Sequence, residues 1–126
     1  MIRTAPFARF AIAAGLLAAA AVAAPPKVPP ATPAGKPVDC VQIANIRETR
    51  VRDDRTIDFF MRSGEVYRNT LPYACPELGF EQSFSYQTSL SQLCAIDTIT
   101  VLRQTGGITP GATCGLGKFQ PVTGLR

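Results

Sequence analysis

Four cysteines constrain the fold of this chain more than any other feature of its sequence. Cys40, Cys75, Cys94 and Cys114 are its only cysteines, and all lie after the first 37 residues. A small chain in an oxidising compartment with an even number of cysteines usually joins them as disulfides. The sequence therefore predicts a small domain braced by two disulfides.

Two absences exclude whole classes of chemistry. The chain has no Cys-x-x-Cys pair, which excludes a thioredoxin-type redox pair and a c-type haem attachment. It also has no histidine, so it lacks the commonest zinc ligand and cannot build a Ser-His-Asp triad or a Cys-His pair. We expect no metal and no cofactor.

Residues 1–23 have the pattern of a cleaved secretory signal peptide. Arg3 and Arg9 precede an uncharged apolar run, and Ala21-Val22-Ala23 is a small-x-small cleavage site. The apolar run is too short for a helix that spans a membrane. We expect cleavage after Ala23, a location in the periplasm or outside the cell, and no membrane span once the signal is removed.

The composition of residues 24–37 predicts a disordered, proline-rich linker. Proline removes backbone donors and holds the chain in extended states, so the segment PPKVPPATPAGKP favours neither a helix nor a sheet. We expect the remaining residues, 38–126, to form a single disulfide-braced β domain.

The net charge of +4 does not belong to this domain. Residues 38–126 hold nine Lys plus Arg and nine Asp plus Glu. The positive excess lies in the predicted signal and linker, so the basic composition is no argument for nucleic-acid binding. We expect no nucleic-acid partner.

Alternating apolar and polar residues indicate strands and give no support for a long helix. In residues 80–87, Phe80, Phe84 and Tyr86 alternate with polar side chains, and Ile96 to Leu102 is rich in β-branched residues. The six predicted strands cover 41–52, 56–62, 65–71, 80–87, 96–102 and 114–120. Residues 72–79, with room for one helical turn, and 105–113 are predicted to be loops.

The turns of the first two hairpins affect which side chains face the core. A two-residue turn at Asp53-Asp54 sets Arg52 opposite Arg55. For the turn at Ser63-Gly64 two registers stay open. A two-residue loop pairs Phe60 with Tyr67, and a three-residue loop pairs Met61 with Tyr67.

Strands joined mostly by short turns predict an all-β fold, a small antiparallel barrel or sandwich of about five to six strands. In an up-and-down meander, strand parity places Cys40 and Cys94 at one end and Cys75 and Cys114 at the other. We therefore expect the disulfides Cys40–Cys94 and Cys75–Cys114.

The first hairpin is unusually dense in charge and is the main candidate for a ligand-binding site. On a strand, Glu48, Arg50 and Arg52 project from one face. Guanidinium groups bind carboxylates and other anions bidentately, although mixed charges on an edge strand also serve simply to prevent aggregation. The candidate ligand-binding residues are Arg47, Arg50, Arg52, Arg55, Asp54, Asp58 and Asp97.

Asp97 and the other carboxylates supply the only catalytic option. Asp97 shares a strand face with Ile99 and Val101, so it either needs a buried partner or lies at the strand's entry in solvent. A carboxylate pair chosen from Asp54, Asp58, Glu65 and Asp97 is the minimum for acid–base catalysis. Calcium binding by Asp53, Asp54 and Asp58 is disfavoured, because the EF-loop spacing is absent and arginines lie beside them.

Four runs of sequence resemble one known family. They are VRDDRTIDF (51–59), VYRNTLPYACPELGF (66–80), LCAIDTITVL (93–102) and CGLGKFQP (114–121). They are similar to a family of small exported bacterial proteins known only as a domain of unknown function. The resemblance covers Cys40 to Pro121, including all four cysteines. It implies export and a cysteine-braced domain, and it implies no activity or catalytic residue.

These observations predict an exported, non-catalytic binding or structural module. Its partner is expected to be an envelope component or another exported protein, bound through the 47–58 hairpin. The alternative is a small carboxylate-based hydrolase that acts on envelope glycans.

Overall fold

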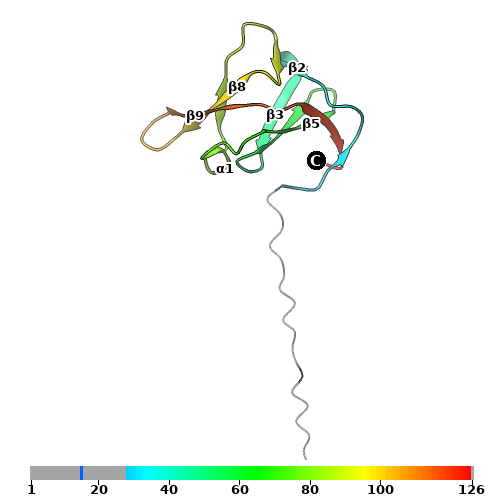
Figure 1. Ribbon diagram of the computed structural model, residues 1–126, viewed down its shortest axis with the longest axis horizontal. Coiled ribbons are helices and arrows are strands. Elements are labelled where there is room, and N and C mark those ends of the chain that lie inside the picture. Colours follow the sequence, from blue (N-terminus) through cyan, green and yellow to red (C-terminus); the bar gives the residue numbers. More distant parts are fainter. Residues whose placement is uncertain (1–14, 16–27, 126) are drawn as a thin grey trace, which may run out of the picture.

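The computed structural model describes Gly15 and residues 28–125 (Figure 1). The predicted signal peptide, 1–23, lies outside these residues except for Gly15. The described chain forms ten strands, one short α-helix and one 3₁₀ turn. These are β1 (Thr32–Pro33), β2 (Cys40–Gln42), η1 (Ile43–Asn45), β3 (Ile46–Val51), β4 (Thr56–Met61), β5 (Val66–Thr70), α1 (Leu78–Glu81), β6 (Phe84–Tyr86), β7 (Gln92–Cys94), β8 (Thr98–Arg103), β9 (Thr109–Gly115) and β10 (Phe119–Thr123).

All strand pairs are antiparallel and form three sheets. The largest has the order β1-β10-β5-β4-β3, the second β6-β8-β9, and the smallest contains only β2 and β7. No sheet closes on itself within residues 28–125, so of the predicted barrel or sandwich the fold is sandwich-like. The ten strands outnumber the predicted five to six for three reasons: η1 divides the predicted strand 41–52, the predicted strand 114–120 falls across the end of β9 and the start of β10, and β1 and β7 lie outside the predicted ranges.

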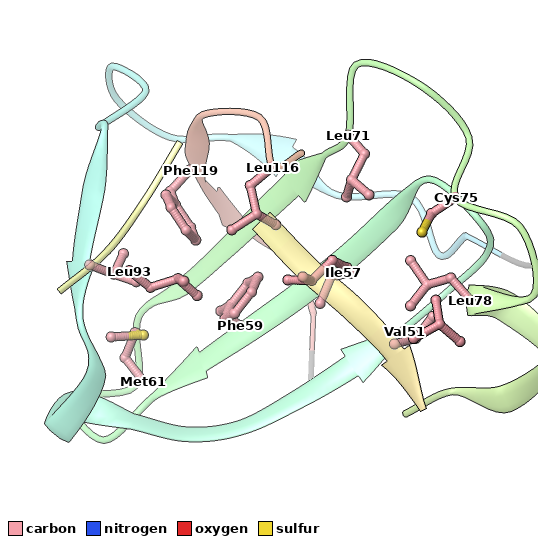
Figure 2. Close-up of a cluster of buried hydrophobic side chains, with 13 residues drawn as sticks. Val51, Ile57, Phe59, Met61, Leu71, Cys75, Leu78, Leu93, Leu116 and Phe119 are labelled. Atoms are coloured by element: carbon pink, nitrogen blue, oxygen red, sulfur yellow. The ribbon is translucent and has the colours of Figure 1, made fainter. Parts of the chain in front are cut away.

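The main core lies where the inner face of the five-stranded sheet meets the two smaller sheets (Figure 2). Phe59 and Phe119 contact edge to face, with ring centroids 5.2 Å apart. Edge-to-face rings satisfy the aromatic quadrupole and fill the centre of the core. Residues from all three sheets pack around them, including Ile57, Met61, Leu71, Leu78, Leu93, Ile99 and Val101.

Strand β4 is buried on both faces along its whole length. Because side chains alternate along a strand, Ile57, Phe59 and Met61 enter the main core, and Thr56, Asp58 and Phe60 face the other way. On that outer face Phe60 packs with Val66 and Val122 in a second, smaller cluster. Phe59 and Phe60 are therefore both buried, on opposite faces.

Neither hairpin has a register that the sequence predicted. In the first, the Arg52 N–H donates to the Thr56 carbonyl at 2.8 Å, so residues 53–55 form a three-residue loop and Arg52 does not face Arg55. In the second, Phe59 pairs with Tyr67, which neither predicted register gives. Its loop is 62–64, with Gly64 at φ 93°, the left-handed conformation that glycine adopts without strain.

The predicted disordered linker, 24–37, is ordered where the structure describes it. Thr32 and Pro33 pair with Thr123 and Val122 at the edge of β10, and the Ala34 N–H donates to the Pro121 carbonyl. Proline is tolerated there because an edge strand needs no donor on its solvent side. This segment covers the free edge of β10, and its Ala31 packs on the outer cluster.

Two further segments differ from the sequence prediction. Phe80 lies in α1 with 83% of its surface exposed, so the strand predicted to begin there starts at Phe84. Alternation of aromatic and polar residues does not separate a short exposed helix from a strand. The predicted loop 105–113 shortens to the turn between β8 and β9, which extends away from the body of the fold (Figure 1).

Both predicted disulfides are present. Cys40 is bonded to Cys94 and Cys75 to Cys114, and the described residues contain no free cysteine. The first joins directly paired residues of β2 and β7. The second ties the loop before α1 to β9. The pairing was predicted correctly although β10 returns beside β5, so the strands do not follow a simple meander.

A buried side-chain amide fastens the chain between β9 and β10. Asn69 is fully buried; its amide nitrogen donates to the Gly117 carbonyl at 2.7 Å, and its amide oxygen accepts from the Gly117 N–H at 2.8 Å. The backbone approaches so closely that a Cβ at position 117 would lie 2.2 Å from the Thr70 carbonyl oxygen. Only glycine fits here without moving the backbone of β5.

We expect Gly117→Ala to lower the free energy of unfolding by about 2 kcal/mol, since the added methyl group overpacks a site bounded by backbone. Urea denaturation followed by far-UV circular dichroism measures the loss. Gly115→Ala is the matched control, because a Cβ there meets nothing within 4 Å. Equal stability of the two variants would contradict this account of Gly117.

Candidate functional site

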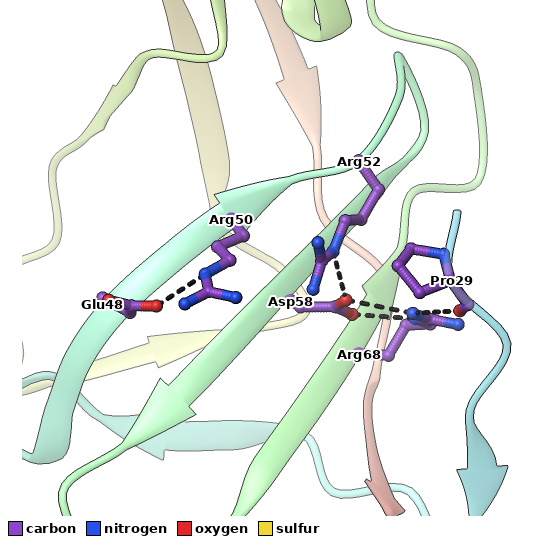
Figure 3. A network of polar contacts seen from close by, with 6 residues as sticks. All are labelled: Pro29, Glu48, Arg50, Arg52, Asp58 and Arg68. Atoms are coloured by element: carbon purple, nitrogen blue, oxygen red, sulfur yellow. Dashed lines mark hydrogen bonds and ion pairs between the residues drawn. The ribbon is translucent and has the colours of Figure 1, made fainter. Parts of the chain in front are cut away.

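Four charged residues of the first hairpin lie on the outer face of the five-stranded sheet: Glu48, Arg50, Arg52 and Asp58 (Figure 3). Arg50 pairs with Asp58 across β3 and β4, and Asp58 pairs with Arg68 across β4 and β5. Directly opposed residues of antiparallel strands point to the same side of a sheet. The register therefore brings Arg68 of β5 and Arg52, the residue after β3, to one carboxylate on β4.

Asp58 is the centre of this cluster. Its side chain is 0% exposed, and it accepts hydrogen bonds from Arg52 Nε at 2.8 Å and from Arg68 Nε and a terminal nitrogen of Arg68 at 2.8 and 3.0 Å. The same Arg68 nitrogen donates to the Pro29 carbonyl at 2.9 Å. Buried charge requires such pairing, and here it joins three strands and the N-terminal segment.

Arg50 makes a second, more exposed set of contacts on this face. Its Nε lies 2.7 Å from a carboxylate oxygen of Glu48, and its guanidinium carbon lies 4.7 Å from the centroid of the Phe60 ring. Cation–π contacts with an arginine are favourable and keep the aromatic ring covered. Glu48, Arg50 and Arg52 thus share one face, as the alternation in the sequence indicates.

The loop that joins β3 and β4 is held rigidly against the segment before α1. Asp53 accepts the Arg55 N–H at 2.8 Å, and Asp54 accepts the Gly79 N–H at 2.8 Å. Arg55 Nε donates to the Leu71 carbonyl at 2.6 Å. A Cβ at Gly79 would lie 3.0 Å from the Asp54 carboxylate, so the small residue permits the close approach.

An open hollow of about 620 Å³ lies between this loop and α1. The exposed ring of Phe80 forms part of its wall. The hollow combines positive, negative and aromatic groups on a backbone fixed by hydrogen bonds. Its lining residues are Arg52, Asp53, Asp54, Arg55, Ala74, Gly79 and Phe80.

The structure groups the predicted site residues unequally. Arg50, Arg52 and Asp58 lie on the outer face, whereas Asp54 and Arg55 lie in the 53–55 loop. Arg47 is exposed at the irregularity in β3 between Ile46 and Glu48.

Asp97 lies in the turn between β7 and β8, apart from this group, where its carboxylate accepts the Cys94 N–H at 2.7 Å. Asp97 therefore lies at the entry to β8, partly exposed, and its partner is a backbone amide.

Sequence reasoning missed Arg68 and the role of Phe80. Arg68 shares a face of β5 with Val66 and Thr70, and a three-residue loop centred on Ser63 would have placed it opposite Asp58. Phe80 was assigned to a strand, and no local pattern marks it as part of a hollow.

Glu65, the remaining candidate carboxylate, lies with Tyr67 in a different hollow. The Tyr67 hydroxyl donates to Glu65 at 3.0 Å. Burial, followed by this hydrogen bond and the charge of Glu65, raises the pKa of Tyr67 above its ordinary value. Tyr67 therefore stays a neutral donor at physiological pH.

Two properties of the described residues bear on ligands. Between residues 28 and 125 no three His, Cys, Asp or Glu side chains are grouped so that they could hold a metal ion. In the same part of the chain, no helix has the length and apolar character to cross a membrane.

Comparison with known proteins gives one match. The model of a family described as "Family of unknown function (DUF6491)" matches residues 2–124. Neither a curated protein nor a solved structure matches the chain.

We expect Asp58→Asn to lower the free energy of unfolding by about 3 kcal/mol, because it leaves two guanidinium groups side by side without their counter-charge. Urea denaturation at neutral pH measures the loss. Glu48→Gln is the control: its pair with Arg50 is 41% and 45% exposed, and such pairs contribute at most about 1 kcal/mol. If the two variants lose the same stability, Asp58 does not have the role described.

Proposed function

The chain belongs to DUF6491, a family of unknown function, and we propose that it is an exported, non-catalytic binding module that holds another exported protein in the hollow beside the 53–55 loop. The observation that carries this proposal is the exposed ring of Phe80, 83% accessible, beside a rigid loop of charged residues. Aromatic residues and arginines are enriched where proteins bind one another.

The rigidity of the loop supports a binding role. Hydrogen bonds from Arg55 to the Leu71 carbonyl and from Gly79 to Asp54 fix the loop before any partner arrives. A surface that is already ordered loses less conformational entropy on binding. The hollow is wide and open, which suits a protein segment better than an enclosed small molecule.

The carboxylates support a binding role over the glycan-hydrolase alternative. Asp58 is held by two guanidinium groups, Asp54 accepts a backbone N–H of Gly79, and Asp97 accepts one of Cys94. A general acid must present its proton to a substrate in a cleft. These three carboxylates instead serve the structure of the domain, and the fourth candidate, Glu65, accepts a hydrogen bond from Tyr67 in a different hollow.

The two disulfides support export. Disulfides persist in the periplasm and outside the cell and are rare in the cytosol, and both bonds here brace the domain. Together with the signal-peptide pattern of residues 1–23, they favour a periplasmic or extracellular location.

A photo-crosslinking amino acid tests the binding surface. Placed at position 80 in the source cells, it should form a discrete adduct with one exported protein, and Asp53→Lys in the same chain should reduce that adduct at least several-fold. The control position is 108, since Ile108 is also largely exposed, at 74%, and lies outside the hollow. The proposal fails if positions 80 and 108 give the same adducts, or if position 80 gives none.

Export has a separate test. Sequencing the N-terminus of the protein purified from the periplasm or medium should begin at Ala24, because the peptidase cuts after a small-x-small motif. Ala21→Asp combined with Ala23→Asp should block processing and leave the uncleaved chain with the membranes. A mature chain that still begins at Met1 would contradict the proposed signal peptide.

A further inference from the structure

The two disulfides lie in very different surroundings. Cys75 is 0% exposed in the main core, whereas its partner Cys114 is partly exposed and packs against that core. Cys40 and Cys94 are both partly exposed and join two short strands, β2 and β7, that form a sheet of their own. A reagent in solution therefore reaches the Cys40–Cys94 bond more readily than the Cys75–Cys114 bond, one of whose cysteines is buried.

Three hollows meet at the Cys40–Cys94 bond. One of about 320 Å³ is lined by both cysteines together with Asp39, Ala95 and Ile96. A second, of about 330 Å³, reaches Cys40, and a third, of about 170 Å³, reaches Cys94. Neither Cys75 nor Cys114 lines any of these three, the Phe80 hollow, or the fifth hollow beside β10.

Exposed apolar side chains surround the same bond. Ile96 is 92% exposed and borders two of the three hollows, and Leu90, 69% exposed, borders one. The nearby carboxylates are occupied: Asp97 accepts the Cys94 N–H at 2.7 Å, and Asp39 lies 3.6 Å from Lys118. This leaves an apolar rim around an accessible disulfide, a surface on which another protein can dock.

We propose that the Cys40–Cys94 bond is a site of thiol–disulfide exchange with a dithiol protein that docks on the rim formed by Ile96 and Leu90. One thiolate of the dithiol forms a bond with one cysteine sulfur, while the Cys40–Cys94 bond breaks and the other sulfur leaves as a thiolate and takes up a proton. The second thiol then attacks the mixed disulfide. The dithiol partner ends oxidised, and this chain gains two electrons and two protons as two thiols.

Reduction at this bond has a defined structural effect. Sheet β2–β7 consists of three residue pairs, and two of its members, Val41 and Leu93, are buried in the main core. Two short strands alone are marginally stable in water. Opening the bond therefore loosens one side of the core, while Cys75–Cys114 still ties the opposite side.

The first test measures which cysteines are reduced in the native protein. Dithiothreitol is added without denaturant, the reaction is stopped with an alkylating reagent at timed intervals, and the labelled cysteines are identified by mass spectrometry. Cys40 and Cys94 should be labelled at least about 10-fold faster than Cys75 and Cys114, because both cysteines of the first bond line hollows, whereas Cys75 of the second is buried and neither of its cysteines lines one. Labelling of all four at one rate, or of Cys75 and Cys114 first, would overturn the proposal.

The second test separates docking from simple accessibility. Reduced thioredoxin replaces dithiothreitol, and Ile96→Asp should slow reduction of Cys40–Cys94 by thioredoxin at least several-fold while leaving its reduction by dithiothreitol unchanged. Ile108→Asp is the matched control, an equally drastic change at a residue that is 74% exposed and borders none of the hollows at this bond. If Ile96→Asp leaves the thioredoxin rate unchanged, or slows both reductants equally, the docking surface is wrong.

Discussion

The carboxylate of Asp58, held between two guanidinium groups, is the contact on which the outer face of the five-stranded sheet depends. Arg52, the residue after β3, and Arg68 of β5 both donate to it, and Arg68 also donates to the Pro29 carbonyl of the N-terminal segment. A protein in which apolar residues replace a buried ion cluster is often as stable as the original. The main effect of this cluster is therefore to fix the register of the strands that it joins. A shift of one residue would turn Asp58 into the main core without a partner.

The outer face of the sheet carries both charged and apolar contacts. Arg50 lies over the ring of Phe60 and pairs with Glu48, so the charged strand covers an aromatic ring. Further along the sheet, Ala31 and Leu125 pack on Phe60, Val66 and Val122. Residues near both ends of the described chain thus pack on the outer face of this sheet. The N-terminal segment, whose composition indicates a linker, is therefore part of the folded domain.

Much of this fold was predictable because the alternation of apolar and polar residues along a strand indicates which of its faces is buried. The strands around Phe84 and Ile99 follow their apolar pattern. The disulfide pairing was also predicted correctly, although the simple meander from which it was argued is not the observed topology. The hairpin registers were not predictable, since Asp53-Asp54 and Ser63-Gly64 suit two-residue turns as well as the three-residue loops observed.

The candidate site was predictable only in part. The charges of β3 and β4 mark the outer face, but Arg68 joins them only through a register that the sequence leaves open. The hollow beside Phe80 depends on a loop that is joined to α1 by the hydrogen bond from the Gly79 N–H to the Asp54 carboxylate, and these two residues are more than twenty positions apart in the chain. No periodic pattern encodes such a contact, because it arises only once the loops have folded.

The order of the cysteines has a consequence for how the molecule is made. Cys40 is bonded to Cys94 and Cys75 to Cys114, so the two covalent loops overlap and no cysteine is bonded to its nearest neighbour in the sequence. A chain that emerges from its N-terminus presents Cys40 and Cys75 together before Cys94 exists. Oxidation in order of appearance would close a wrong loop. Correct maturation therefore requires that the strands pair before the bonds close, or that a catalyst of disulfide rearrangement corrects the first bond formed.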